Sequence, residues 1–277
     1  GAFLAAPEFD PTYERSGGYG YCWPRDAAEV VLALEAVGLR AICLRFLEWA
    51  RHVQEENGFW EQRYWLNGER GPAWCTIEGH FQLDQVGSML LAIERVLTAL
   101  PDDPREEMMK RFWTVVERGA EFLAARLDEE TGLVRPGCDL WETFRGTFTY
   151  TNASVWAGLR AAGNLARGQG EDAFAAAWEK RAGKIKSAVL ERLWTGSFFA
   201  RGLDMTGELD AGADSSILGV IDPFQMLDLD NERERKMAES CIETIEERLA
   251  LKVDGEHGVA RFEGDQYLGG SAGGVNT

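Results

Sequence analysis

Hydrophobic residues recur at intervals of three and four along most of the chain, with polar residues between them. This spacing places apolar side chains on one face of an α-helix. About seven segments show the pattern, and only short segments are typical of strands, chiefly residues 196–201. We therefore expect a mainly α fold, with helical stripes that begin at Val30, Ile42, Val86, Phe112, Val155, Phe174 and Met237.

The connections between the expected helices are unequal in length. The first two helices are joined through Gly38, whereas long segments at 57–83, 137–152 and 195–214 hold much of the glycine and aromatic content. Helical hairpins arranged in a ring would bring the long connections to one face, where function is commonly located. The sequence shows no repeat of fixed period and no linker. We expect a single domain over residues 1–277.

Composition restricts the partners. The chain has 277 residues, 45% of them hydrophobic, which is enough for a substantial core. Its net charge of −17 argues against nucleic acid, because phosphate binding needs a surplus of Lys and Arg. The same charge gives no reason to expect an anionic membrane as partner, and no apolar run approaches the length of a membrane span.

Cysteine and histidine usage indicates neither a metal centre nor a disulfide framework. The five cysteines are scattered without a CxxC pair, and His52, His80 and His257 lie far apart. Zinc sites and disulfide scaffolds show tighter spacing than this. We expect no metal, and the odd cysteine count favours a reducing compartment such as the cytoplasm.

The first candidate segment is GGYGYCWPRDAA, at 17–28. Pro24 suits the first position of a helix and Asp26 its first turn, where an acid also stabilises the helix dipole. Trp23 ends a glycine-rich approach, and Arg25 and Asp26 follow after Pro24. An aromatic face beside a hydrogen-bond donor and an acceptor fits a sugar ring.

The second candidate segment is GCDLWETFRGTFTYTN, at 137–152. It places Glu142 among aromatic residues, and loss of solvation raises the pKa of a carboxyl group. A carboxyl that keeps its proton near neutral pH can serve as a general acid in glycoside hydrolysis. Asp139 lies in a more polar stretch and could bind hydroxyls. The alternative is that Glu142 is an ordinary surface residue of a loop.

A third segment, GVARFEGDQYLGG at 258–270, again combines an arginine, two acids and aromatic residues with glycines. Together the three segments resemble glycoside hydrolase family 15, the glucoamylase, glucodextranase and trehalase-like family. The opening GAFLAAPEFDPTYERSGGYGYCWPRDAA, the segment FQLDQVGSMLLAI, the tetrapeptide DLWE and the late RFEGDQYLGG follow the family order and spacing. The resemblance covers the whole chain.

The resemblance implies an (α/α)6 barrel that hydrolyses terminal α-glucosidic bonds in malto- or isomalto-oligosaccharides with inversion and without a cofactor. Glu142 would be the general acid. Arg25 and Asp26 would bind hydroxyls of the terminal glucose, with Asp139 nearby. Trp23 and Trp141 would line that subsite, and Arg261 would hold the sugar from the opposite side.

The chain departs from the family pattern at several points. Thr143 stands where fungal members carry a second Glu, and GGSAGGVNT replaces the common continuation GGNPW. An inverting hydrolase needs a second carboxylate about 6.5–9.5 Å from the first, and the family's base lies beyond the position of Thr277. Glu263 and Asp265 are the candidates for a substitute. With about seven helices against the twelve of a barrel, we expect a partial barrel that lacks the last helices and an N-terminal β-domain.

The sequence is also consistent with two other functions. One is a helical carbohydrate-binding or scaffold domain without catalysis, and the other is a different α/α-barrel enzyme such as a trehalase or an epimerase. The sequence does not distinguish α-1,4, α-1,6 and α,α-1,1 linkages.

Overall fold

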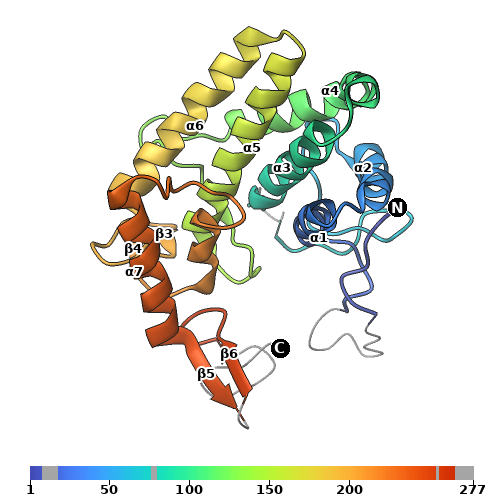
Figure 1. Cartoon of the computed structure of the whole chain (residues 1–277). Helices are drawn as coiled ribbons and strands as arrows, with labels where there is room; N and C mark the ends of the chain where they lie inside the picture. The colour runs from blue at the N-terminus through green and yellow to red at the C-terminus, as the bar shows by residue number, and fades with distance from the viewer. Residues whose placement is uncertain (8–17, 76–79, 254–255, 266–277) are drawn as a thin grey trace. The chain divides into compact units, whose positions relative to one another are not determined.

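The computed structural model describes residues 1–7, 18–75, 80–253 and 256–265 (Figure 1). The chain divides into two compact units. Unit 1 comprises Gly1–Leu127 and Ser154–Lys184, and unit 2 comprises Asp128–Ala153 and Ile185–Thr277. Each unit is considered by itself below.

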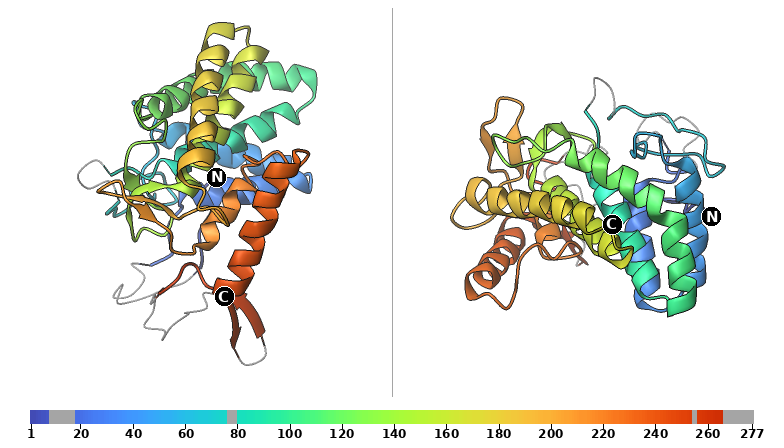
Figure 2. Two further views of the ribbon diagram at one scale, coloured as in Figure 1. Left: turned by 90° about the vertical axis from the view of Figure 1, so that its left-hand side faces the viewer. Right: turned by 90° about the horizontal axis from the view of Figure 1, so that it is seen from above.

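Unit 1 is helical. It contains α1 (Pro24–Ala36), α2 (Arg40–Val53), α3 (Asp84–Thr98) and α4 (Asp102–Ala124), most of α5 (Thr149–Gly168) and the first part of α6 (Asp172–Arg192). Helix α3 contacts α1, α2 and α4, and α1 and α3 run side by side (Figure 2). The α3 residues from 84 to 93 are all buried, which identifies α3 as the central helix of this unit.

Two glycines allow α3 and α5 to approach each other closely. A Cβ atom added to Gly158 would lie 2.6 Å from the Cα of Gly87. A Cβ atom added to Gly87 would lie 2.3 Å from the carbonyl oxygen of Ser154. The hydroxyl of Ser154 in turn donates a hydrogen bond to the carbonyl oxygen of Asp84, over 2.6 Å. The contact thus fixes the start of α3, which carries Asp84.

Unit 2 combines a small sheet with a helix and a hairpin. Strands β1 (Gly137–Cys138), β2 (Arg145–Phe148), β3 (Gly202–Asp204) and β4 (Leu209–Asp210) form an antiparallel sheet in the order β1-β2-β3-β4. The 3-10 helix η2 (Ser215–Val220) and α7 (Glu232–Leu249) follow. The hairpin of β5 (Ala250–Val253) and β6 (Glu256–Val259) comes after α7.

The register of the sheet places the loop that carries Glu142. Gly137 pairs with Gly146, and Cys138 pairs with Arg145, so residues 139–144 form the loop between β1 and β2. Gly146 meets β3 closely, because a Cβ atom at this position would lie 2.2 Å from the carbonyl oxygen of Leu203. A glycine is therefore needed beside the loop.

The structure confirms the mainly α fold, and each of the seven hydrophobic stripes lies in one of the helices α1 to α7. The expected strand at 196–201 is wrong. That segment turns, with an isolated bridge from Trp194 to Phe199, and the strand is the following segment, β3. The segment 137–152 also differs from the expected plain connection between two helices. It forms the β1–β2 hairpin, and α5 already begins at Thr149.

Within the described ranges, none of the helices has the length and apolar character needed to cross a bilayer. All five cysteines are buried and carry free thiols.

Candidate functional site

Glu142 lies in the β1–β2 loop, and the carboxylate of Asp139 organises this loop. Asp139 accepts backbone N–H bonds from Trp141 at 3.2 Å and from Thr143 and Phe144 at 2.8 Å each. One short side chain thus binds three of the loop's amides, as Asp side chains do in tight turns. The loop is held in one conformation by its own first residue.

The backbone of Glu142 adopts a conformation that residues other than glycine avoid. Its φ is +61°, in the left-handed region. Such a conformation costs about 1–3 kcal/mol and persists where the surrounding structure enforces it, often at functional sites. The N–H of Glu142 donates to the carbonyl oxygen of Asp139 over 3.2 Å, and the residue is half-buried.

Asp139 differs from the expectation of a polar setting. The residue is only 1% exposed, and burial raises the pKa of its carboxyl to about 6, although its hydrogen bonds from backbone amides oppose this. The negative charge of Asp214 raises the pKa of Asp139 further. The local amino-acid sequence does not show which of the two nearby carboxyl groups, Asp139 or Glu142, becomes buried in the fold. The three backbone hydrogen bonds described above link the carboxylate of Asp139 to the loop itself.

The side chain of Trp141 is held by a buried carboxylate. Its indole Nε1–H donates to Oδ1 of Asp214 over 3.0 Å, and the Nε–H of Arg201 donates to Oδ2 over 3.0 Å. Asp214 is 1% exposed. Arg201 also pairs with Asp210 at 2.7 Å.

Sequence reasoning missed Arg201 and Asp214. Both lie within the long segment 195–214. The available signal was an arginine that shares a long connection with several acids. No local motif marks Asp214, because the indole that it binds, that of Trp141, is 73 positions away.

The structure brings Arg261 to Trp141. The guanidinium carbon of Arg261 lies 5.4 Å from the ring centroid of Trp141, within the range of a cation–π contact. Two N–H groups of Arg261 bind the two carboxylate oxygens of Asp265, at 2.6 Å each. Trp141, Glu142 and Arg261, three of the predicted site residues, therefore belong to one unit and two of them are in contact.

The two acids considered as a substitute base are both engaged. The carboxylate of Glu263 binds the guanidinium of Arg248 at 2.7 and 2.6 Å and accepts the N–H of Ala213 at 3.0 Å. Asp265 is 1% exposed and bound by Arg261. Bidentate pairs of this kind stabilise the charged carboxylate and occupy the oxygens that a base would present to water.

In unit 1, Trp23 directly precedes α1, and Arg25 and Asp26 lie in its first turn. Arg25 is 8% exposed, and its guanidinium lies 3.2 Å from Asp84 and 3.4 Å from Asp26. The side chain of Asp26 is 53% exposed. Asp26 is thus the accessible acid of this cluster, and Asp84 is its buried one.

Asp84 is a second residue that the sequence did not single out, although it lies in the segment FQLDQVGSMLLAI. It is fully buried, and burial raises the pKa of its carboxyl while the ion pair with Arg25 opposes the increase. Among the described residues its Oδ1 atom has no hydrogen-bond partner. Asp84 orients Arg25 from the buried side.

Trp23 packs in a cluster around Arg63, which sequence reasoning also missed. The guanidinium of Arg63 lies 5.1 Å from the ring of Trp23, 4.4 Å from Tyr21 and 4.7 Å from Trp74. Arg63 is 2% exposed and donates to the carbonyl oxygen of Pro72 over 2.6 Å. These contacts fix the indole of Trp23 in front of α1.

The seven predicted site residues are divided between the units. Unit 1 holds Trp23, Arg25 and Asp26, and unit 2 holds Asp139, Trp141, Glu142 and Arg261. Each set forms a connected group within its own unit. That all seven line one pocket stays a prediction.

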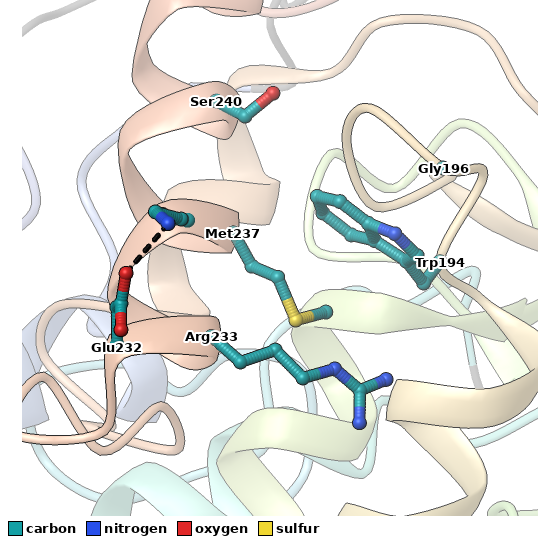
Figure 3. Close-up of a pocket in the computed structure, with 7 residues that line it drawn as sticks. Trp194, Gly196, Glu232, Arg233, Met237 and Ser240 are labelled. Carbon is teal, nitrogen blue, oxygen red and sulfur yellow. Dashed lines mark hydrogen bonds and ion pairs between the residues drawn. The ribbon is translucent and has the colours of Figure 1, made fainter.

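Unit 2 also contains a groove of about 540 Å³ between α7 and the turn after α6 (Figure 3). Trp194 lies across from Met237 and Arg233 in this groove, and Lys236 pairs with Glu232 at 2.7 Å. The residues that line the groove do not include any predicted site residue. They are Trp194, Gly196, Glu232, Arg233, Lys236, Met237 and Ser240.

Comparison with known proteins identifies the family. The model of Glycosyl hydrolases family 15 matches residues 1–274, and the chain belongs to this family. The chain is also 33% identical, over 273 residues, to an uncharacterized glycosyl hydrolase of Methanocaldococcus jannaschii. That match covers 98% of this chain, which spans 40% of the length of this relative.

Solved structures share the fold. A wild-type glycosidase has a TM-score of 0.75 and 23% identity, and the match covers 98% of this chain and 70% of that one. A bacterial glucoamylase complexed with acarbose has a TM-score of 0.72 and 17% identity, with 93% and 39% covered. The glucoamylase of Saccharomycopsis fibuligera has a TM-score of 0.71 and 16% identity, with 99% and 63% covered. The chain thus shares the fold of these glucoamylases, and its described helices, α1 to α7, account for part of the twelve helices of an (α/α)6 barrel.

Proposed function

We propose that the protein hydrolyses terminal α-glucosidic bonds of malto- or isomalto-oligosaccharides with inversion, and that Glu142 is its general acid. Family membership supports glycoside hydrolysis. The role of Glu142 is supported by its position in the loop that Asp139 holds through three backbone amides. In this loop Glu142 follows Trp141, whose indole N–H binds Asp214, and precedes strand β2. A positioned carboxyl of this kind can protonate the oxygen of the leaving sugar.

In the proposed reaction, the proton of Glu142 passes to the glycosidic oxygen as the bond from that oxygen to the anomeric carbon breaks. A second carboxylate takes a proton from a water molecule as the water oxygen attacks the anomeric carbon from the opposite face, which gives β-glucose. Arg261 binds sugar hydroxyls beside Trp141, and Trp141 packs against the C–H face of the ring. In unit 1, Arg25 and Asp26 are proposed to bind sugar hydroxyls, and Trp23 to pack against a sugar ring.

We assign Asp139 a different role from direct sugar binding. Its oxygens accept three backbone amides, so we propose that it keeps the loop around Glu142 folded. We propose neither Glu263 nor Asp265 as the base, because each is held by an arginine. The second carboxylate of the inverting pair is then a residue other than these two.

The test is product analysis with the full-length protein. Maltose, isomaltose and trehalose are incubated separately, and the anomer first released is followed by proton NMR. The proposal expects β-glucose from maltose or isomaltose, from the non-reducing end. Release of α-glucose would contradict inversion. Binding of these sugars without turnover would favour a carbohydrate-binding domain, and turnover of trehalose alone would favour a trehalase-like enzyme.

A further inference from the structure

Asp214 is a buried carboxylate whose two oxygens are both occupied by side-chain donors. Oδ1 accepts the indole N–H of Trp141 at 3.0 Å and the backbone N–H of Ser216 at 2.9 Å. Oδ2 accepts the Nε–H of Arg201 at 3.0 Å. Because Asp214 is 1% exposed, water does not compete for these bonds.

The partners of Asp214 lie on both sides of Glu142. Trp141 precedes Glu142 directly. The guanidinium of Arg201 lies 4.2 Å from the ring of Phe144, two residues after Glu142, and 5.3 Å from the ring of Phe262. One carboxylate therefore anchors the residue before Glu142 by a direct hydrogen bond, and it also binds the arginine that packs on Phe144, two residues after Glu142.

This anchoring acts where the backbone conformation is unfavourable. Glu142 has a φ of +61°, so the loop must be held from outside to keep this conformation. Asp139 holds the loop through its backbone amides, and Asp214 holds it through the indole of Trp141. The two carboxylates use different donors, because Asp139 binds backbone amides and Asp214 binds the indole N–H.

We infer that Asp214 is a positioning residue, which acts through Trp141 to aim the carboxyl of Glu142. The inference rests on the proposed function, in which Glu142 donates the proton. It assigns Asp214 no contact with the substrate. Its effect should therefore appear in turnover and should depend on the indole N–H of Trp141.

Three variants of the full-length protein separate this role from a general contribution to stability. Asp214→Ala removes both acceptors and should lower kcat by about 10²-fold, the size expected when a catalytic group is displaced by about 1 Å. Asp214→Asn keeps one acceptor oxygen for the indole and should lose less. Asp210→Asn is the matched control, because it removes the other carboxylate from Arg201 and leaves the Trp141–Asp214 bond intact. Its kcat should stay close to that of the wild type.

A double-mutant cycle provides the decisive readout. Trp141→Phe keeps an aromatic ring but removes the N–H donor. If Asp214 acts through this donor, Asp214→Ala, which removes the acceptor, should cost several-fold less in kcat in the Trp141→Phe background than in the wild type. Equal losses in the two backgrounds would overturn the inference. Asp214→Asn and Trp141→Phe also carry the test if Asp214→Ala does not fold.

Failure of the proposed function would look different. The indole N–H resonance of Trp141, assigned by its loss in Trp141→Phe, should shift in Asp214→Asn whatever the reaction is. If the resonance shifts but the wild type hydrolyses no glucoside, the proposed function fails and the hydrogen bond stands. If the wild type is active and both Asp214→Asn and Asp214→Ala keep the wild-type kcat, the inference about Asp214 fails while the proposed function stands.

Discussion

The guanidinium of Arg25 lies 3.2 Å from the carboxylate of Asp84, on the central helix of unit 1. Asp84 is fully buried and Arg25 nearly so, whereas Asp26, the other acid near this guanidinium, is half-exposed. The sequence marked Arg25 and Asp26 as neighbours at a helix start. The structure adds the buried partner, which determines where the guanidinium points.

Removal of Asp84 should destabilise the protein. Asp84→Ala leaves the buried guanidinium of Arg25 without its buried counter-charge, and breaking such a pair costs about 3–5 kcal/mol. Urea unfolding should show this loss. Asp26→Asn is the control, because its acid is half-exposed and the change should cost less than about 1 kcal/mol. Equal losses in the two variants would contradict the importance of the buried pair.

The close approach of α3 and α5 predicts opposite effects for two helical glycines. Gly158→Ala places a Cβ atom 2.6 Å from the Cα of Gly87, so the helices must separate, and overpacking of this kind costs about 1–3 kcal/mol. Gly183→Ala in α6 places its Cβ atom in open space and should stabilise the protein by about 0.5–1 kcal/mol, since alanine favours a helix. Thermal unfolding of the two variants measures the difference. A Gly158→Ala protein as stable as the wild type would show that the helices are not in tight contact.

The buried carboxyl of Asp139 predicts a pH dependence of stability. Its pKa is raised from an ordinary 3.8 to about 6, so the folded state binds more protons than the unfolded state between these values. The contribution of Asp139 to stability should therefore fall as pH rises from about 4 to about 6, by about 3 kcal/mol at most. Asp139→Asn should remove this slope in urea unfolding measured across the window.

Asp128 offers a control of opposite sign. The pKa of the Asp128 carboxyl is lowered from its ordinary 3.8, chiefly by the hydrogen bond from the backbone N–H of Thr131. The stability that Asp128 contributes is therefore lost as the pH falls below the ordinary pKa of an aspartate and through the lowered one. Asp128→Asn should therefore leave the decrease between pH 4 and 6 in place. If Asp139→Asn keeps that decrease as well, the slope has another source.

The sequence predicted the helices well because their stripes follow a local period. It failed at residues 196–201, where a short apolar run has no period long enough to distinguish a turn from a strand. In the candidate site, Glu142 and its aromatic neighbours were found because they are adjacent in the chain. Arg201 and Asp214 were not, because Asp214 binds Trp141 from 73 positions away and Arg201 is linked to Trp141 only through Asp214. The burial of Asp139 likewise depends on the folded loop.

The central claim is that Glu142 donates a proton to the leaving group. The most direct measurement is kcat of Glu142→Gln in the full-length protein, with maltose and with glucosyl fluoride. The glutamine keeps the size of the side chain but has no acidic proton, so kcat on maltose should fall by about 10²–10⁴-fold or more. Fluoride leaves without protonation, and kcat on glucosyl fluoride should be partly restored. Asp26→Asn, which would weaken hydroxyl binding, should be rescued much less. Equal losses of Glu142→Gln on both substrates, or unchanged turnover of maltose, would contradict the claim.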